Sequence, residues 1–535
     1  MTTTSTSAAS RAVAVGAAFA VLALAGCGSA RDLAVGATTA PTSEPTSGST
    51  SGPTTAPPTS GSTSTPGTTG TVGGSLSPFY DQQVAWTSCG AAQCGTVTVP
   101  LDYANPGGDT VTLQLRKHPA TSGHPVGTLF INPGGPGGSG LDFVDQFVGE
   151  AGASILENYD VVGFDPRGVG MSDPVTCLDT TQLDAFVAAD PTPDNPAEVK
   201  TAEQLVQELG QGCEQRSGEL AAHVSTIEVA KDLDIMRAAV GDDSLTYYGA
   251  SYGTYIGANY AELFPDQVGR MVLDGALDPA LSPQQTNLQQ AGGFQGALDA
   301  YVADCLHRPD CPLPGPESAA LGRIQSLLNG LDAKPLNTGD SARPLTEALG
   351  FYGVAVTLYN KDYWKYLDQG LQAAFNGDGS VLLTLADAYL SRGPSGYTDN
   401  SAEVISAVNC LDHPVQMSTA AIEKSIPAYT KVSPTFGRVF AWSMIGCAEW
   451  PIQPTQQPLK IDGQGAAPIV VVGTTRDPAT PYAWAKALAG ELRSGVFLSR
   501  DGDGHTGYGM GNSCIDDTIN SYFTDGTVPP DGKSC

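Results

Sequence analysis

The chain has few positively charged residues for its size. Its 535 residues include 26 Lys and Arg against 55 Asp and Glu, and the formal net charge is −29. With so few basic residues the chain has no basic patch, and we expect no nucleic-acid partner. An acidic surface suits a soluble protein that works outside the cell, but it identifies no substrate.

The apolar run near the N-terminus is too short to span a bilayer comfortably. It covers residues 12–25, follows Arg11 and ends in Leu-Ala-Gly-Cys at positions 24–27. Such a segment predicts a targeting signal. Its end resembles a bacterial lipoprotein box, which implies cleavage before Cys27 and a lipid on that cysteine. We therefore expect residues 1–26 to be a lipoprotein signal peptide. The mature protein would be anchored to the outer face of the membrane or envelope without spanning it. The alternative is an ordinary signal peptide followed by a chance cysteine.

Large apolar side chains are scarce in residues 27–76, where Ser, Thr, Pro and Gly dominate. This stretch cannot bury enough surface to fold, so we expect a flexible tether between the membrane and the rest of the chain. The globular part is expected to begin near Ser77.

Zinc-site patterns are also lacking. No pair among the eleven cysteines has the spacing or the neighbouring histidines of a zinc site, and we expect no metal or other cofactor. With Cys27 assigned to the lipid, ten cysteines remain, and an even number in an exported chain predicts about five disulfides. Pairing between nearest neighbours is the simplest arrangement: Cys89/Cys94, Cys177/Cys213, Cys305/Cys311, Cys410/Cys447 and Cys514/Cys535.

What the sequence does have is an alternation of strand and helix patterns. This alternation predicts an α/β fold whose mostly parallel sheet is covered on both faces. Strands are expected at 95–101, 109–116, 127–132, 159–164, 244–248, 270–274, 467–473 and 495–498. Between the strands expected at 270–274 and 467–473 the pattern becomes helical, with helices expected at 282–306, 317–331, 361–375 and 381–390. We therefore divide the globular part into a first core segment (77–280), a helical cap (281–458) and a C-terminal core segment (459–535).

One turn organises this pattern. The strand that ends near Tyr248 runs into Gly-Ala-Ser-Tyr-Gly at positions 249–253, and a helix follows. A strand, Gly-x-Ser-x-Gly and a helix in this order form a nucleophile elbow, in which the tight turn exposes the serine. Ser251 is the candidate nucleophile of an α/β-hydrolase.

The glycine-rich loop at 134–140 has two interpretations. It matches Gly-x-Gly-x-x-Gly after a strand and before a helix, and Asp165 lies about where a ribose-binding acid would, so a dinucleotide-binding oxidoreductase is an alternative. Against it, Pro133 and Pro136 lack the amide donors that a pyrophosphate needs. Asp165 also runs directly into a Pro-Arg-Gly turn, and nicotinamide cofactors are scarce outside the cell.

The same loop also suits an oxyanion hole. In α/β-hydrolases one oxyanion donor is the amide after the nucleophile, here Tyr252, and the other lies on the glycine loop after an earlier strand. Glycine there lets the backbone approach a substrate carbonyl. Gly135 is the first candidate for this donor and Gly134 the second.

The remaining triad members follow by elimination. In this fold the acid and then the histidine come after the serine. Of the histidines beyond Ser251, His307 and His413 lie in the expected cap, and only His505 follows a sheet strand. Asp477 stands at the end of the preceding strand. We therefore predict Ser251 as nucleophile, His505 as general base and Asp477 as the acid that orients it.

With these residues in order, the chain resembles the secreted actinobacterial tripeptidyl-aminopeptidase family, within the prolyl-iminopeptidase-like serine peptidases. The resemblance implies peptide hydrolysis near a free N-terminus, with a helical cap that measures length. It does not fix how many residues are removed, and some relatives cut proteins internally or act on esters. The motifs that carry it cover most of the chain after the tether: 99–103, 132–137, 165–168, 249–254, 272–275, 409–412, 447–451 and 475–481.

An enzyme that cuts near a free N-terminus must bind the substrate's ammonium group, which calls for a carboxylate in the cap. Asp412 and Glu449 are the candidates, because a bridge between Cys410 and Cys447 would bring them near each other. Three hypotheses follow. The main one is a lipid-anchored serine aminopeptidase acting on peptides. The others are an esterase or endoprotease with the same residues, and a non-catalytic envelope lipoprotein, which would not need all these parts in order. The oligomeric state is left open.

Overall fold

The computed structural model describes residues 75–414, 417–447 and 450–535. The predicted signal peptide, residues 27–74 of the tether (Cys27 included) and Glu449 lie outside the described residues. Within those ranges, no helix is both long enough and apolar enough to cross a membrane.

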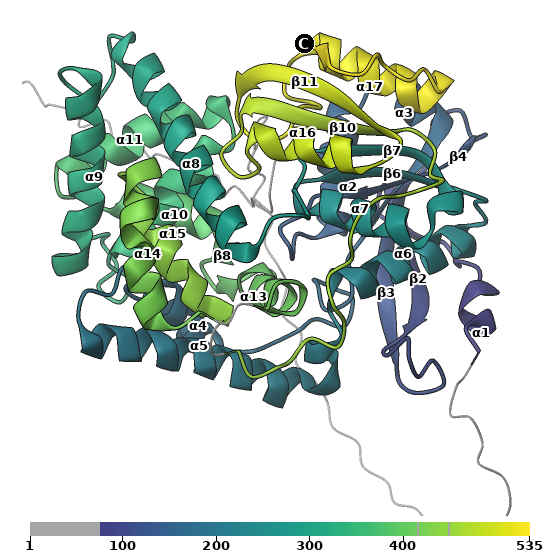
Figure 1. Cartoon of the computed structure of the whole chain (residues 1–535), viewed down its shortest axis with the longest axis horizontal. Helices are drawn as coiled ribbons and strands as arrows, with labels where there is room; N and C mark the ends of the chain where they lie inside the picture. The colour runs from purple at the N-terminus through teal and green to yellow at the C-terminus, as the bar shows by residue number, and fades with distance from the viewer. Residues whose placement is uncertain (1–74, 415–416, 448–449) are drawn as a thin grey trace, which may run out of the picture. The chain divides into compact units, whose positions relative to one another are not determined.

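A ten-stranded sheet forms the core, in the order β1-β2-β3-β5-β4-β6-β7-β10-β11-β12 (Figure 1). β3 is antiparallel to β2 and β5, β1 is antiparallel to β2, and the strands from β5 to β12 pair in parallel. The strands are β1 (Thr87–Cys89), β2 (Ala92–Pro100), β3 (Thr110–His118), β4 (Gly127–Asn132), β5 (Tyr159–Phe164), β6 (Leu245–Ala250), β7 (Val268–Asp274), β10 (Ile469–Arg476), β11 (Gly495–Asp503) and β12 (Lys533–Ser534). This is the predicted α/β-hydrolase architecture, with the elbow strand β6 in the middle of the sheet.

Helices cover both faces of the sheet, because the central strands are apolar on both sides. In β4, Phe130 packs into one hydrophobic cluster while its neighbours Leu129 and Ile131 pack into another. The first cluster takes side chains from α6 (Thr226–Val240), α7 (Tyr252–Leu263) and α16 (Tyr482–Glu491). The second takes them from α2 (Gly140–Glu150), α3 (Ala153–Asn158) and α17 (Ser513–Asp525). α2 and α3 are separate helices, because the chain is extended at Ala151 and Gly152 between them.

The cap is a second group of helices with its own hydrophobic core (Figure 1). Between β7 and β10 the chain forms α8 (Pro283–Leu306), α9 (Glu317–Ala333), α10 (Glu347–Leu358), α11 (Trp364–Phe375), α12 (Ser380–Tyr389), α13 (Ser401–Asp412), α14 (Thr419–Val432) and α15 (Gly437–Ser443). Within it, a small hairpin joins β8 (Arg392–Gly393) and β9 (Gly396–Tyr397). The four helices expected in this region are present.

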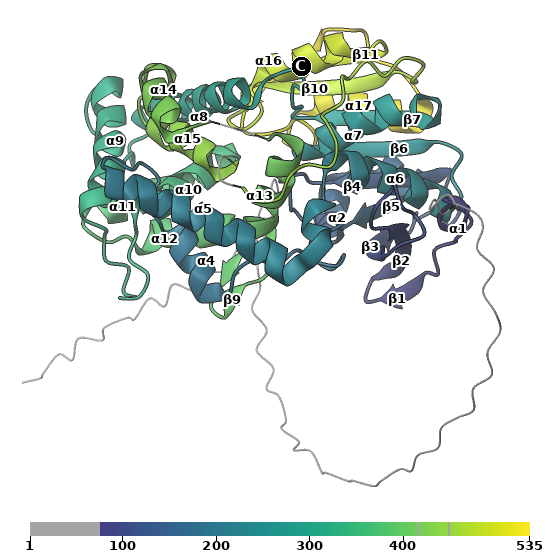
Figure 2. The ribbon, with the colours of Figure 1, turned by 60° about the horizontal axis from the view of Figure 1, so that its bottom comes forward.

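A second segment joins the cap from inside the first core segment. After β5 the chain forms α4 (Thr180–Val187) and α5 (Pro196–Ser217), which the sequence division placed in the core. Leu183 and Val187 pack into the cap's hydrophobic core, and Val206 packs against Ile422 and Trp442. Figure 2 shows α5 lying along the cap helices. The cap is therefore built from two chain segments, because α4 and part of α5 turn apolar side chains toward cap helices. Leu209 and Cys213, further along α5, pack into the first cluster of the sheet.

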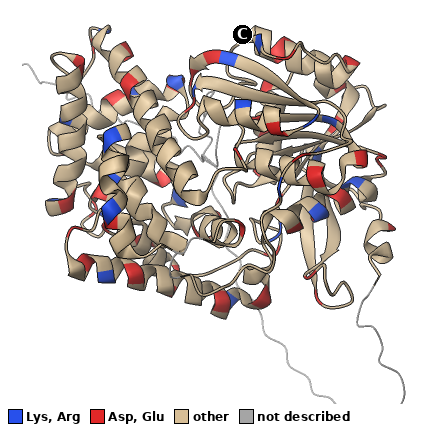
Figure 3. Ribbon diagram, in the orientation of Figure 1, with Lys and Arg blue, Asp and Glu red and all other residues tan. Residues whose placement is uncertain are grey.

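The five nearest-neighbour disulfides are present. They join Cys89 to Cys94, Cys177 to Cys213, Cys305 to Cys311, Cys410 to Cys447, and Cys514 to Cys535. The predicted pairing is confirmed for all ten cysteines. Acidic residues occur on the cap and on the core alike (Figure 3).

Candidate active site

Ser251 lies at a sharp turn between β6 and α7. Its φ of 56° and ψ of −124° are values that side-chain-bearing residues rarely adopt. A Cβ added to Gly249 would lie 2.4 Å from the Gly253 carbonyl oxygen, and one added to Gly253 would lie 2.8 Å from the Asn132 carbonyl oxygen. The turn therefore needs both glycines, and it holds Ser251, half-buried, at the carboxyl end of a central strand.

The glycine loop after β4 packs against this turn. Gly134 and Gly135 have φ of +91° and +113°, and a Cβ on Gly134 would lie 2.7 Å from the Tyr252 amide nitrogen. The Gly134 amide donates to Asn132 Oδ1 at 2.9 Å. Because that donor is used within the loop, the geometry favours the Gly135 amide as the partner of the Tyr252 amide.

Asp165 does not face a ligand site. Its carboxylate accepts hydrogen bonds from Ser139 Oγ at 2.7 Å, from the Leu141 amide at 3.3 Å and from the Met171 amide at 2.9 Å. Burial raises the pKa of this carboxyl, and the three donors oppose the rise. Asp165 holds the start of α2 to the loop after β5, so the acid required by the dinucleotide alternative is already occupied.

Asp477 and His505 are directly paired. Both carboxylate oxygens lie within 2.9 Å of His505 Nδ1, at 2.9 Å for Oδ1 and 2.8 Å for Oδ2. His505 is buried, with 1% of its surface exposed. Asp477 also accepts from the amides of Ala479 and Thr506, at 2.9 and 3.1 Å. A carboxylate held in this way can fix the tautomer and orientation of the ring.

Thr480 belongs to this group, although the sequence did not single it out. Its amide donates to Asp477 Oδ1 at 2.8 Å, and its Oγ1 donates to Asp477 Oδ2 at 3.1 Å. The same Oγ1 lies 3.3 Å from His505 Nδ1. Thr480 lies inside the motif at 475–481, one of those that carry the family resemblance. This position was the signal by which the sequence could have identified it.

The histidine loop meets the serine turn through β7. The Ser251 amide donates to the Asp274 carbonyl at 2.9 Å. The next residue is Gly275, whose added Cβ would lie 3.1 Å from His505 Cε1. The structure therefore brings the predicted serine, acid and histidine to the same end of neighbouring strands.

The cap contacts both the histidine and the glycine loop. The His505 amide donates to the Tyr359 carbonyl at 2.8 Å, and the Tyr359 ring stands edge-on to the imidazole at 5.4 Å between centroids. On the other side, a Cβ on Gly137 would lie 2.6 Å from Val404 of α13. The cap therefore encloses the site from two directions.

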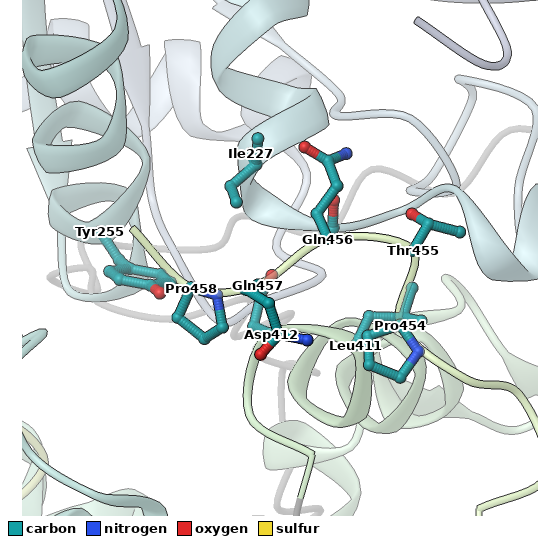
Figure 4. Close-up of a pocket in the computed structure, with 10 residues that line it drawn as sticks. Ile227, Tyr255, Leu411, Asp412, Pro454, Thr455, Gln456, Gln457 and Pro458 are labelled. Atoms are coloured by element: carbon teal, nitrogen blue, oxygen red, sulfur yellow. The ribbon is translucent and has the colours of Figure 1, made fainter. Parts of the chain in front are cut away.

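Asp412 does not fit the role expected for it. It lies at the end of α13 with 7% of its surface exposed, and both carboxylate oxygens accept from Thr226, from the amide at 2.8 Å and from Oγ1 at 2.5 Å. Thr226 Oγ1 also hydrogen-bonds the Tyr252 hydroxyl. Burial raises the pKa of Asp412 to about 7. Figure 4 shows it in a small pocket with Tyr255 and Pro458. The carboxylate links the cap to α6 and α7, which leaves it poorly placed to bind an ammonium group.

The described residues offer one group of carboxylates that could hold a metal ion. Asp190, Asp332 and Glu347 have oxygens within 4.8 Å of one another. Thr192 donates to two of them, through its amide to Asp190 and through Oγ1 to Glu347. The group therefore serves as a hydrogen-bonded junction between α10 and the loop before α5.

Comparison with known proteins agrees with this geometry. A family model described as "TAP-like protein" matches residues 433–535. Serine protease Hip1 of Mycobacterium tuberculosis is 39% identical over an alignment of 480 residues, which covers 86% of this chain and 92% of that protein. Carboxylesterase B of the same species is 39% identical over 477 residues, covering 86% and 91%. Tripeptidyl aminopeptidase of Streptomyces lividans is 33% identical over 468 residues, covering 84% and 86%.

Proposed function

The chain belongs to the TAP-like family of α/β-hydrolases, and from that premise we propose that it is an exported serine aminopeptidase that cuts peptides near a free N-terminus. The substrate class rests on the relative named tripeptidyl aminopeptidase and on the enclosure of the site by the cap.

Ser251 Oγ attacks the scissile carbonyl while His505 takes its proton. The amides of Gly135 and Tyr252 stabilise the negative oxygen that forms. His505 then gives the proton to the leaving amine, and the released peptide leaves an acyl-enzyme on Ser251. Water, activated by His505, hydrolyses this ester and restores the serine. Asp477 orients the imidazole and stabilises its charged form throughout.

One observation carries the proposal: cap residues touch both sides of the site. Tyr359 lies against His505, and Ser401 and Val404 lie against the glycine loop at Gly137. A site closed in this way favours substrates whose chain begins only a few residues before the reacting bond. An enzyme that cuts within long chains needs an open groove on both sides.

The ammonium group of such a substrate requires a carboxylate, and Asp412 is already bound to Thr226. Glu449 therefore becomes the first candidate. The test compares kcat/KM on peptides with a free and with an acetylated N-terminus. Acetylation is expected to lower kcat/KM by roughly 10²- to 10³-fold, because it removes a charged partner and leaves the carboxylate unpaired. Glu449→Gln should cause a similar loss of kcat/KM on free peptides and none on acetylated peptides. Asp412→Asn is the matched control and should leave kcat/KM nearly unchanged on both. Equal rates on free and acetylated peptides would refute the aminopeptidase proposal but not the hydrolase.

An esterase or an endoprotease is the second candidate. The names carboxylesterase B and serine protease Hip1, both at 39% identity, favour it. Neither reaction needs an ammonium site. A chain that hydrolyses aryl esters and acetylated peptides as well as free peptides would belong to this group.

For localisation we keep the lipid anchor on Cys27 as a proposal, supported by the lipobox-like sequence and by the five disulfides. Cys27→Ser is expected to move the protein from the membrane fraction to the medium when cells are fractionated. Retention of the variant on the membrane would mean that another segment is the anchor.

A further inference from the structure

Asp274 is a buried carboxylate between the serine turn and the histidine loop. It ends β7, has 0% of its surface exposed, and accepts three hydrogen bonds. The amides of Gly507 and Tyr508 donate to it at 2.8 Å each, and the Tyr248 hydroxyl donates at 2.9 Å. The first two donors follow His505 on the same loop.

The backbone of the same residue holds the nucleophile. Its carbonyl accepts from the Ser251 amide at 2.9 Å, and the Gly275 position next to it lies against the imidazole. Asp274 therefore joins the serine turn to the histidine loop, with its main chain bound to one and its side chain bound to the other.

These contacts require a carboxylate. The three donors point at two oxygens, Oδ1 for Gly507 and Oδ2 for Tyr508 and Tyr248. An asparagine presents one oxygen and an NH₂ group, so at least one of these amides would face another donor. Burial nevertheless raises the pKa of Asp274 to about 6, which means that charge is retained there at a cost.

The charged groups that act on Asp274 come from β11 and its loop, and they are Arg500 and His505. The other titratable neighbour is the neutral Tyr248 phenol of β6, which donates to the carboxylate. The Arg500 guanidinium donates to the carbonyls of Asp503 and Thr506 at 3.2 and 3.3 Å, which holds the same loop from its other side. His505 Nδ1 is bound to Asp477, so Asp274 acts on the imidazole without touching that nitrogen.

We propose that Asp274 is a positioning residue: it fixes the His505 loop against the Ser251 turn and places a second negative charge beside the imidazole. The inference rests on the proposed serine-hydrolase function.

The test is the pH dependence of kcat/KM for Asp274→Asn on a free peptide. We expect kcat to fall by roughly 10- to 100-fold with KM within about threefold, since the loop and not the substrate is affected. The midpoint of the ascending limb, which reports the general base, should move to lower pH by about half a unit to one unit. The direction follows because removing a negative charge destabilises the imidazolium. An unchanged midpoint would overturn the proposal.

Asp165→Asn is the matched control. Asp165 is also a buried aspartate just after a sheet strand and also accepts three hydrogen bonds, but β4 and β6 separate its strand from β7. Its replacement should leave the midpoint in place whatever it does to the rate. A shift of equal size in Asp165→Asn would show a general effect of losing a buried carboxylate and would refute the assignment to Asp274.

Tyr248→Phe keeps the test decisive if Asp274→Asn does not fold. Loss of the phenol donor favours the neutral, protonated form of Asp274 and so weakens the negative charge beside the imidazole. The ascending limb should therefore move to lower pH by about half a unit, in the same direction as for Asp274→Asn. A wild-type profile for Tyr248→Phe would contradict the inference. If Ser251→Ala itself retains full activity, the proposed function fails, whereas an unshifted profile in an enzyme that needs Ser251 rejects only the role of Asp274.

Discussion

The carboxyl edge of the sheet and the cap differ in how their acidic residues are placed. At the sheet edge, Asp477 follows a strand and its carboxylate is bound to His505. In the cap, Asp412 ends a helix and its carboxylate is bound to Thr226. It is therefore not available for the substrate's ammonium group, which was the role that we expected. Chain order fixes which strand ends meet in a parallel sheet, whereas the direction of a helix-end side chain depends on how the helices pack. The position of an acidic residue in the sequence therefore predicts its role well at the sheet edge and poorly in the cap.

The largest effect expected at the sheet edge is that of Ser251→Ala. Loss of the nucleophile should lower turnover by roughly 10⁴- to 10⁶-fold and abolish labelling by a fluorophosphonate. Circular dichroism of the variant should match the wild type, because alanine fits the turn as well as serine does. Undiminished labelling would place the nucleophile elsewhere.

The same chemical change at the two acids tests the comparison directly. Asp477→Asn should lower kcat by about 10⁴-fold, since the amide no longer stabilises the charged imidazole in the required tautomer. Asp412→Asn should change kcat/KM by less than about threefold, both on free and on acetylated peptides. Equal losses in the two variants would mean that the cap acid also takes part in the reaction.

The positions of the residues at the carboxyl edge of the sheet could be predicted from the sequence for a physical reason. Ser251, Asp477 and His505 each follow a strand of the parallel sheet, so the order of the strands alone brought them together. Thr480 and Asp274 escaped notice because their roles depend on side-chain hydrogen bonds that no spacing shows. The same holds for α4 and α5, whose amphipathic pattern says that they are helices but not which neighbour they cover.

Tyr359→Ala should have a smaller effect, because it removes the ring beside His505 and keeps the carbonyl that accepts from the histidine amide. We expect kcat/KM to fall by roughly tenfold, through a looser imidazole. Tyr352→Ala is the matched control, since its ring stacks on Tyr389 at 5.3 Å within the cap. A loss in Tyr352→Ala equal to that in Tyr359→Ala would point to general loosening of the cap.

The smallest expected effect is a change in stability with pH for Asp412→Asn. Burial raises the pKa of the Asp412 carboxyl in the folded protein to about 7, from its ordinary value of 3.8. The folded state therefore holds the proton more tightly, and the stability that this group contributes is lost as pH rises from about 4 to about 7. Asparagine does not titrate. The Tm difference, variant minus wild type, should therefore rise by a few degrees between pH 4.5 and 8, measured by calorimetry. A constant difference would show that Asp412 is charged over the whole range.

The disulfides have a consequence for how the two regions stay together. Each of the five bridges spans between 5 and 37 residues, and none ties a cap helix to a strand of the sheet. Within the described residues, the contacts from Tyr359 to His505 and from Asp412 to Thr226 across that joint are non-covalent. Oxidation therefore stabilises the chain locally, and the contacts between cap helices and sheet strands depend on hydrogen bonds and packing alone.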